Sequence, residues 1–174
     1  AVVLKNGKVL VGGGLGSENT YELYDPSTNK WTLTSSPSKI TADRANLVLL
    51  ADGRVLSTYE HDGQIYDPAT ETWTLLSSKL IGERTFHSTV LLNNGNVLIT
   101  GSTSTDDQTT AEIFNATTQT FTAVPPMTQN RAVSKAVLMD NGKVLTYGLG
   151  DFFNPINTKV IEVYDPVTNS WSSN

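Results

Sequence analysis

One short phrase occurs four times along this chain of 174 residues, and it constrains the fold more than any other feature. In each copy an apolar run leads into Asn-Gly or Asp-Gly, and Val-Leu begins two residues after the glycine. The four pairs are Asn6-Gly7, Asp52-Gly53, Asn94-Gly95 and Asn141-Gly142. Such pairs are strong hairpin signals, since both central residues of a type I′ turn need positive φ. The sequence therefore predicts four β-hairpins in a repeat protein.

The residues on both sides of each turn are almost continuously apolar. We expect the incoming strands at 1–4, 46–50, 88–92 and 135–139. The outgoing strands are expected at 8–11, 54–57, 96–99 and 143–146. Apolar residues at consecutive positions are typical of strands that are buried on both faces.

A second phrase follows each hairpin and predicts a third and a fourth strand. Its copies lie at 22–26, 64–68, 112–116 and 162–166, and three of them end in Asp-Pro. Asp-Pro favours a turn, because proline fixes φ and the aspartate side chain can bond the backbone two residues on. In every copy one aromatic residue is followed seven positions later by another: Tyr24 and Trp31, Tyr66 and Trp73, Phe114 and Phe121, Tyr164 and Trp171. One strand-three position always holds an acid or amide, which we interpret as part of the architecture of the repeat: Glu22, Gln64, Glu112 and Glu162.

Together these phrases resemble the kelch repeat, with its Gly-Gly, its Glu-x-Tyr-Asp-Pro segment and its later Trp. The resemblance covers essentially the whole chain, although only the first copy keeps the double glycine, as Gly12-Gly13. It implies an all-β fold, a β-propeller in which each repeat is one four-stranded antiparallel blade. We expect a single domain over 1–174, with repeats at about 1–38, 39–80, 81–127 and 128–174.

The number of repeats leaves the closure of the ring open. The family resemblance implies six or seven blades as the usual number, and four would form an unusually tight ring. Four blades would close alone, two copies would complete a larger ring, or the chain would be part of a longer one. We expect a ring closed by the chain itself or by a homodimer, with self-association slightly favoured.

Composition excludes several classes of function. The net charge of −5 and the isoelectric point near 4.9 argue against nucleic acid as a partner. No apolar stretch approaches the roughly 18 residues of a membrane span, so no membrane partner is expected. The absence of cysteine excludes disulfides, thiolate zinc sites and cysteine nucleophiles. The first residue is Ala1, which leads us to expect a processed, trimmed or excised chain, with secretion or the periplasm slightly favoured over the cytoplasm.

Arginines recur just before the first strand of a repeat and are the first candidates for a site: Arg44, Arg84 and Arg131. In alternating strands, the connections from strand four to strand one and the loops from strand two to strand three emerge on one face. In one interpretation the arginines converge there and bind a carboxylate or sugar hydroxyls. In the other they join neighbouring blades, with Asp43 and Glu83 as the nearest acids in sequence.

Two other loops contain candidate binding residues. His61 lies between Glu60 and Asp62, and an imidazole between two carboxylates could bind a partner or a metal. The histidines of the chain do not have the spacing of a metal-binding motif, so no metal is expected. Phe152 and Phe153 are not required by the blade pattern and suit either the core or a rim that stacks on a sugar or anchors a protein. Asp106 and Asp107 are expected in a solvated loop.

These observations favour a binding module without catalysis or cofactor, whose partner is a protein bound through the variable loops and the arginine-bearing connections. The alternative is a carbohydrate-binding or enzyme-associated propeller of a secreted protein. The phrase around Asn141 is similar to that of galactose oxidase-like proteins. Their copper site requires a cysteine that this chain lacks, so the resemblance does not imply oxidase activity.

Overall fold

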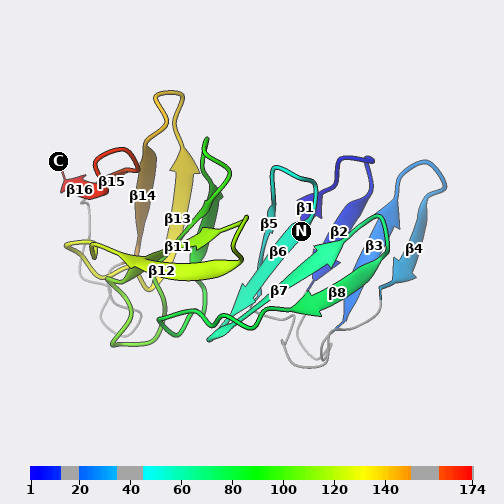
Figure 1. Ribbon diagram of the computed structural model, residues 1–174, viewed down its shortest axis with the longest axis horizontal. Coiled ribbons are helices and arrows are strands. Elements are labelled where there is room, and N and C mark those ends of the chain that lie inside the picture. The colour runs from blue at the N-terminus through cyan, green and yellow to red at the C-terminus, as the bar shows by residue number, and fades with distance from the viewer. Residues whose placement is uncertain (13–19, 35–44, 150–160, 174) are drawn as a thin grey trace.

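The computed structural model describes residues 1–12, 20–34, 45–149 and 161–173, and these form four separate four-stranded antiparallel sheets (Figure 1). Within every sheet the strands lie in sequence order, as in the blades of a β-propeller. The first two blades comprise β1 (Val2–Val3), β2 (Val9–Gly12), β3 (Tyr21–Asp25) and β4 (Lys30–Leu33), then β5 (Asn46–Leu49), β6 (Val55–Tyr59), β7 (Asp62–Asp67) and β8 (Thr72–Leu75). The last two comprise β9 (Ser88–Leu91), β10 (Val97–Thr100), β11 (Ala111–Asn115) and β12 (Thr120–Val124), then β13 (Val133–Leu138), β14 (Val144–Leu149), β15 (Glu162–Asp165) and β16 (Ser170–Ser173). The predicted all-β blade architecture is confirmed, and no helix of the described residues is long and apolar enough to cross a membrane.

The four hairpins occur where the sequence predicts them, but the predicted turn type is wrong. In the first hairpin the Gly7 amide donates to Leu4 O, and Gly7 alone has positive φ, at 82°. This is a type I turn followed by a glycine in the left-handed region, rather than a type I′ turn. Asn6 has a different role, because its Oδ1 accepts a hydrogen bond from the Lys8 amide at 3.0 Å. The same side-chain bond recurs at Asp52, Asn94 and Asn141.

The second turn of each blade is as the sequence predicts. Asp25 Oδ1 accepts the Ser27 amide at 2.9 Å, two residues on. Equivalent bonds are made by Asp67, Asn115 and Asp165. The aromatic pairs seven residues apart stand opposite each other on strands three and four, with ring centroids about 5 Å apart in every blade. The constant spacing therefore reflects packing across the outer strand pair.

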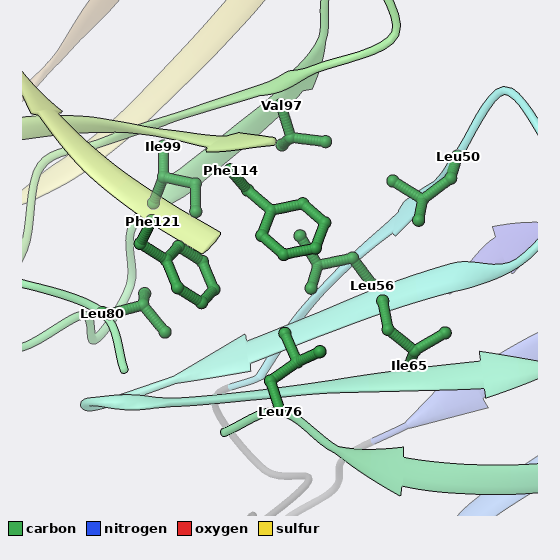
Figure 2. Close-up of a cluster of buried hydrophobic side chains, with 9 residues drawn as sticks. All are labelled: Leu50, Leu56, Ile65, Leu76, Leu80, Val97, Ile99, Phe114 and Phe121. Carbon is green, nitrogen blue, oxygen red and sulfur yellow. The ribbon is translucent and has the colours of Figure 1, made fainter. Parts of the chain in front are cut away.

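Neighbouring blades pack through two unlike faces. We call the face with leucine on strand two and a branched aliphatic on strand three the aliphatic face, and the opposite one, with the ring pair, the aromatic face. In the cluster of Figure 2, Leu56 and Ile65 from the aliphatic face of blade 2 meet Phe114 and Phe121 from the aromatic face of blade 3. The interfaces between blades 1 and 2 and between blades 3 and 4 repeat this arrangement. Every internal interface thus joins an aliphatic face to the aromatic face of the next blade.

The blades form a series in which the first and the last do not meet. Strand β1 packs beside β5, β5 beside β9 and β9 beside β13, and among the described strands the packing does not return from β13 to β1. Blades 1 and 4 stand at opposite ends of the series (Figure 1). The expectation that the hairpin strands are buried on both faces therefore fails at the two ends, where Val3 and Val137 are exposed.

Candidate functional site

The connections between blades and the loops between strands two and three share one end of the molecule, which we call the connection face. It lies at the lower edge of Figure 1, opposite the Asn-Gly turns. Backbone hydrogen bonds join its segments: the Thr103 amide donates to Thr85 O at 3.0 Å, and the Met127 amide to Thr109 O at 2.8 Å. The loop from β10 to β11 is therefore fixed to the connections on both sides of blade 3.

Arg84 lies inside this face rather than on it. Its side chain is buried, and its Nε donates to Glu112 Oε1 at 2.7 Å on the central strand β11. Its Nη1 also donates to Thr110 Oγ1 at 2.8 Å and to the carbonyl of Gly101 at 3.3 Å. The other carboxylate oxygen of Glu112 accepts the Ile81 amide at 2.9 Å. The buried carboxylate of Glu112 thus binds two residues of the connection, Ile81 and Arg84, which are three positions apart.

Arg131 repeats this arrangement in blade 4. Its Nη2 donates to Glu162 Oε2 at 3.0 Å, and both side chains are buried. The Thr128 amide and hydroxyl, three residues before the arginine, donate to Glu162 Oε1 at 2.6 and 2.8 Å. The two arginines therefore join each connection to strand three of the blade that it enters.

Sequence reasoning missed these partners, since it named the adjacent acids Asp43 and Glu83. Arg44 and Asp43 lie outside the described residues. The signal that would have found the pairs is the acid of strand three, which the sequence analysis assigned to blade architecture without a partner.

His61 lies in the tight connection from β6 to β7, and its side chain is exposed. Its Nδ1 lies 3.4 Å from Leu80 O, and its carbonyl accepts the Leu80 amide at 3.0 Å. On either side, the Glu60 backbone pairs with that of Arg84, and Asp62 forms an ion pair with Lys79. Within the described ranges no group of three acidic or histidine side chains is placed to hold a metal.

His87 is a buried histidine to which the sequence gave no role. Its Nε2 lies 2.7 Å from Thr58 Oγ1 across the interface between blades 2 and 3. Burial, with a smaller contribution from the charge of Arg84, lowers the pKa of His87 to about 3. The ring is therefore neutral at pH 7 and serves as a polar contact between blades.

A pocket of about 210 Å³ opens beside Arg84 on the connection face. Its walls are mostly apolar and come from the connection, the end of the β10–β11 loop and the ends of β11 and β12. They are formed by Ile81, Gly82, Arg84, Asp107, Thr110, Ala111, Ala123, Val124 and Pro126. Asp107 Oδ2 accepts a hydrogen bond from the Glu83 amide at 2.8 Å and so fixes the rim of the pocket. The sequence analysis expected this residue in a solvated loop.

Two exposed apolar residues of the same connection were also missed. Ile81 is 57% exposed at the pocket, and Phe86 is 43% exposed with a φ of 53°. A bulky residue in the left-handed region is uncommon, and such residues concentrate at functional sites. Phe152 and Phe153, the aromatics that the sequence did single out, lie outside the described residues.

Comparisons with known proteins give the fold a counterpart. No protein-family model matches the chain, and no curated protein matches it. Among solved structures, that of YjhT is similar with a TM-score of 0.74 over 99% of this chain, at 16% sequence identity. The likeness shows the fold alone. The chain spans 63% of the length of that protein, less than two thirds.

Proposed function

We propose that this chain is a kelch-repeat binding module without catalytic activity, which takes a protein partner on its connection face. The pocket beside Arg84 carries the proposal. Its volume of about 210 Å³ lies below the roughly 300–1,000 Å³ of pockets that hold small-molecule ligands. Apolar walls of this size suit a single apolar side chain of a protein, the kind of anchor that dominates protein interfaces.

The frame around the pocket supports the same function. Glu112 binds both Ile81 and Arg84, and Asp107 binds the Glu83 amide between them, so three hydrogen bonds restrain the connection without a partner. A site that is ordered in advance loses less entropy on binding. Ile81 is exposed at the pocket, and exposed His61 contacts Leu80, the residue before it, so both extend the surface available to a partner.

Site-specific photo-cross-linking tests the proposal. A photoreactive residue at Ile81 should capture one protein from the source cells, whereas the same residue at Val167, which is exposed on a turn at the opposite end, should not. The captured protein is then purified and titrated calorimetrically. Ala123→Phe, which fills the pocket from an exposed position, should weaken its binding at least tenfold, and Thr118→Phe on an exposed turn should not. Equal binding by both variants would count against the pocket.

Carbohydrate is the second candidate, and one observation favours it. Phe86 is exposed on the connection face, and an exposed aromatic ring suits stacking on a sugar. A glycan array separates the two candidates, because binding that is lost in Phe86→Ala, Phe152→Ala or Phe153→Ala would favour the sugar. Hydrolytic or oxidative turnover that disappears in His61→Ala would overturn a function without catalysis.

A further inference from the structure

The pocket beside Arg84 has hydrogen-bonding groups as well as apolar walls. Arg84, whose side chain is 1% exposed, lines the pocket together with Gly82 and Asp107. Its Nε donates to Glu112, and its Nη1 donates to oxygen atoms of the β10–β11 loop. Within the described part of the chain, no residue accepts a hydrogen bond from its Nη2. The two N–H groups of this nitrogen are therefore available to a group that enters the pocket.

The Asp107 carboxylate places an acceptor close to the same nitrogen. Its Oδ2 accepts a hydrogen bond from the Glu83 amide at 2.8 Å, whereas its Oδ1 has a weak contact of 3.5 Å with the Thr110 hydroxyl. A Cβ added at Gly82 would lie 2.8 Å from Asp107 Oδ1 and 3.1 Å from Arg84 Nη2. The acceptor and the donor thus flank one glycine at the wall of the pocket.

An acceptor and a donor this close together restrict the chemistry of the group that binds to both. A carboxylate cannot donate to Asp107, and an ammonium group cannot accept from Arg84. A hydroxyl does both, since its oxygen accepts one hydrogen bond and its proton is donated in another. An anion is disfavoured further, because Arg84 is already paired with Glu112 and Asp107 stands beside it.

The other walls determine what carries the hydroxyl. Ile81, Ala111, Ala123, Val124 and Pro126 present mainly apolar surface. Serine and threonine have too little apolar surface to cover these walls, and the further hydroxyls of a sugar would face them without hydrogen-bond partners. A phenol has an apolar ring with one hydroxyl at its tip, which fits both parts of the pocket.

We propose that the side chain bound in this pocket is a tyrosine of the protein partner, with its ring against the apolar walls and its hydroxyl bonded to Arg84 Nη2 and Asp107 Oδ1. This inference rests on the proposed function and specifies the anchor. Tyrosine is among the residues that dominate the energetics of protein interfaces. Phosphorylation of the tyrosine would replace its hydroxyl by an anion beside Asp107, so the phosphorylated partner should not bind.

A pair of probes that differ by one hydroxyl tests the inference. N-acetyl-tyrosinamide and N-acetyl-phenylalaninamide are titrated into the unaltered chain, and binding is followed through the NMR shifts of the Ile81 and Ala123 amides. The tyrosine probe should bind roughly tenfold more tightly, because hydrogen bonds to charged groups are the stronger ones. N-acetyl-phosphotyrosinamide should not shift these signals. Ala123→Phe should abolish the binding of both neutral probes, and Thr118→Phe should leave both unchanged.

Arg84→Lys gives a second measurement. An ammonium group at this position keeps a cation beside Glu112 but lacks a second nitrogen, so the preference for tyrosine over phenylalanine should disappear in a variant that thermal unfolding shows to be folded. The comparison on the unaltered chain does not depend on that variant.

The outcomes separate this inference from the proposed function. Equal affinity of the two neutral probes for the unaltered chain would overturn the tyrosine and leave the pocket as a site for an apolar side chain. Absence of shifts with N-acetyl-tyrosinamide, or shifts with the phosphorylated probe, would overturn it as well. The proposed function fails separately, when cross-linking at Ile81 captures no protein.

Discussion

A buried arginine requires a partner, because removing a charge from water costs several kcal/mol. Arg84 meets this requirement with Glu112 and with oxygen atoms of the β10–β11 loop. The arginine that the sequence offered as a ligand-binding group is therefore occupied within its own blade. Its guanidinium positions the connection, in which Ile81 stays exposed.

Replacing Arg84 measures this role. Arg84→Ala leaves the Glu112 carboxylate buried without its cation, and the free energy of unfolding should fall by about 3–5 kcal/mol. Adding Glu112→Gln, the residue type that blade 2 has at this position, should recover part of the loss because a neutral amide is less costly to bury. Urea denaturation measures both variants. A loss under 1 kcal/mol for the single variant would show that the pair does not stabilise the blade.

His87 predicts a pH dependence of stability. Its pKa is lowered from 6.5 to about 3 in the folded chain, so below pH 6.5 the unfolded chain takes up a proton that the folded chain does not. The stability that His87 contributes is fully present above pH 6.5. It is lost as the pH falls toward 3, by about 1.4 kcal/mol per pH unit. Asp25 and Asp165 are half-buried, and their pKa values are lowered from 3.8 by hydrogen bonds, so they affect stability only at lower pH.

Urea denaturation at several pH values between 7.5 and 4.5 isolates the histidine. His87→Gln keeps a polar group that is neutral in both states, so its unfolding free energy should change less over this interval than that of the unaltered chain. Parallel pH curves for the two proteins would show that His87 is not the group responsible.

The hairpins show what local sequence determines and what it leaves open at the scale of an element. Strand positions were predictable, because an Asn-Gly pair between two apolar runs is compatible with few structures other than a β-hairpin. The turn type was not, since Asn at this position suits two geometries. It tolerates positive φ, and its side chain can also accept the amide two residues on, as Asn94 does from Asn96 at 3.1 Å.

The turn glycines provide a test that packing does not complicate. A Cβ at Gly95 would meet only Ala51 Cβ, at 4.0 Å, so the cost of substitution comes from its φ of 83°. Gly95→Ala should lower the unfolding free energy by about 1–2 kcal/mol, and Gly95→Asn by less, because Asn tolerates the left-handed region. Chemical denaturation compares the two. Equal losses would indicate that contacts, and not backbone conformation, set the cost.

The site was less predictable than the strands because its contacts are distant in sequence. Arg84 and Glu112 are 28 residues apart, and Arg131 and Glu162 are 31 apart. Each pair can be predicted only once the strand order of the blade is known. The pocket has the same origin, since its walls come from three segments that meet on the connection face.

At the scale of the whole molecule, four nearly equivalent sequences have unequal surroundings. The apolar pattern predicts burial on both faces for every blade, but burial depends on the neighbour, and blades 1 and 4 have a neighbour on one side only. In arrays of repeats, stability is close to a sum of the repeats and their nearest-neighbour interfaces. The inner blades should therefore be more stable than the end blades.

Amide hydrogen exchange followed by mass spectrometry measures this gradient. At low micromolar concentration the central strands β6, β7, β10 and β11 should exchange at least tenfold more slowly than β2, β3, β14 and β15, since each 1.4 kcal/mol of local stability is a factor of ten. Equal protection in all four blades at low concentration would mean that the chain opens as one cooperative unit, in which an uncovered face costs a blade nothing.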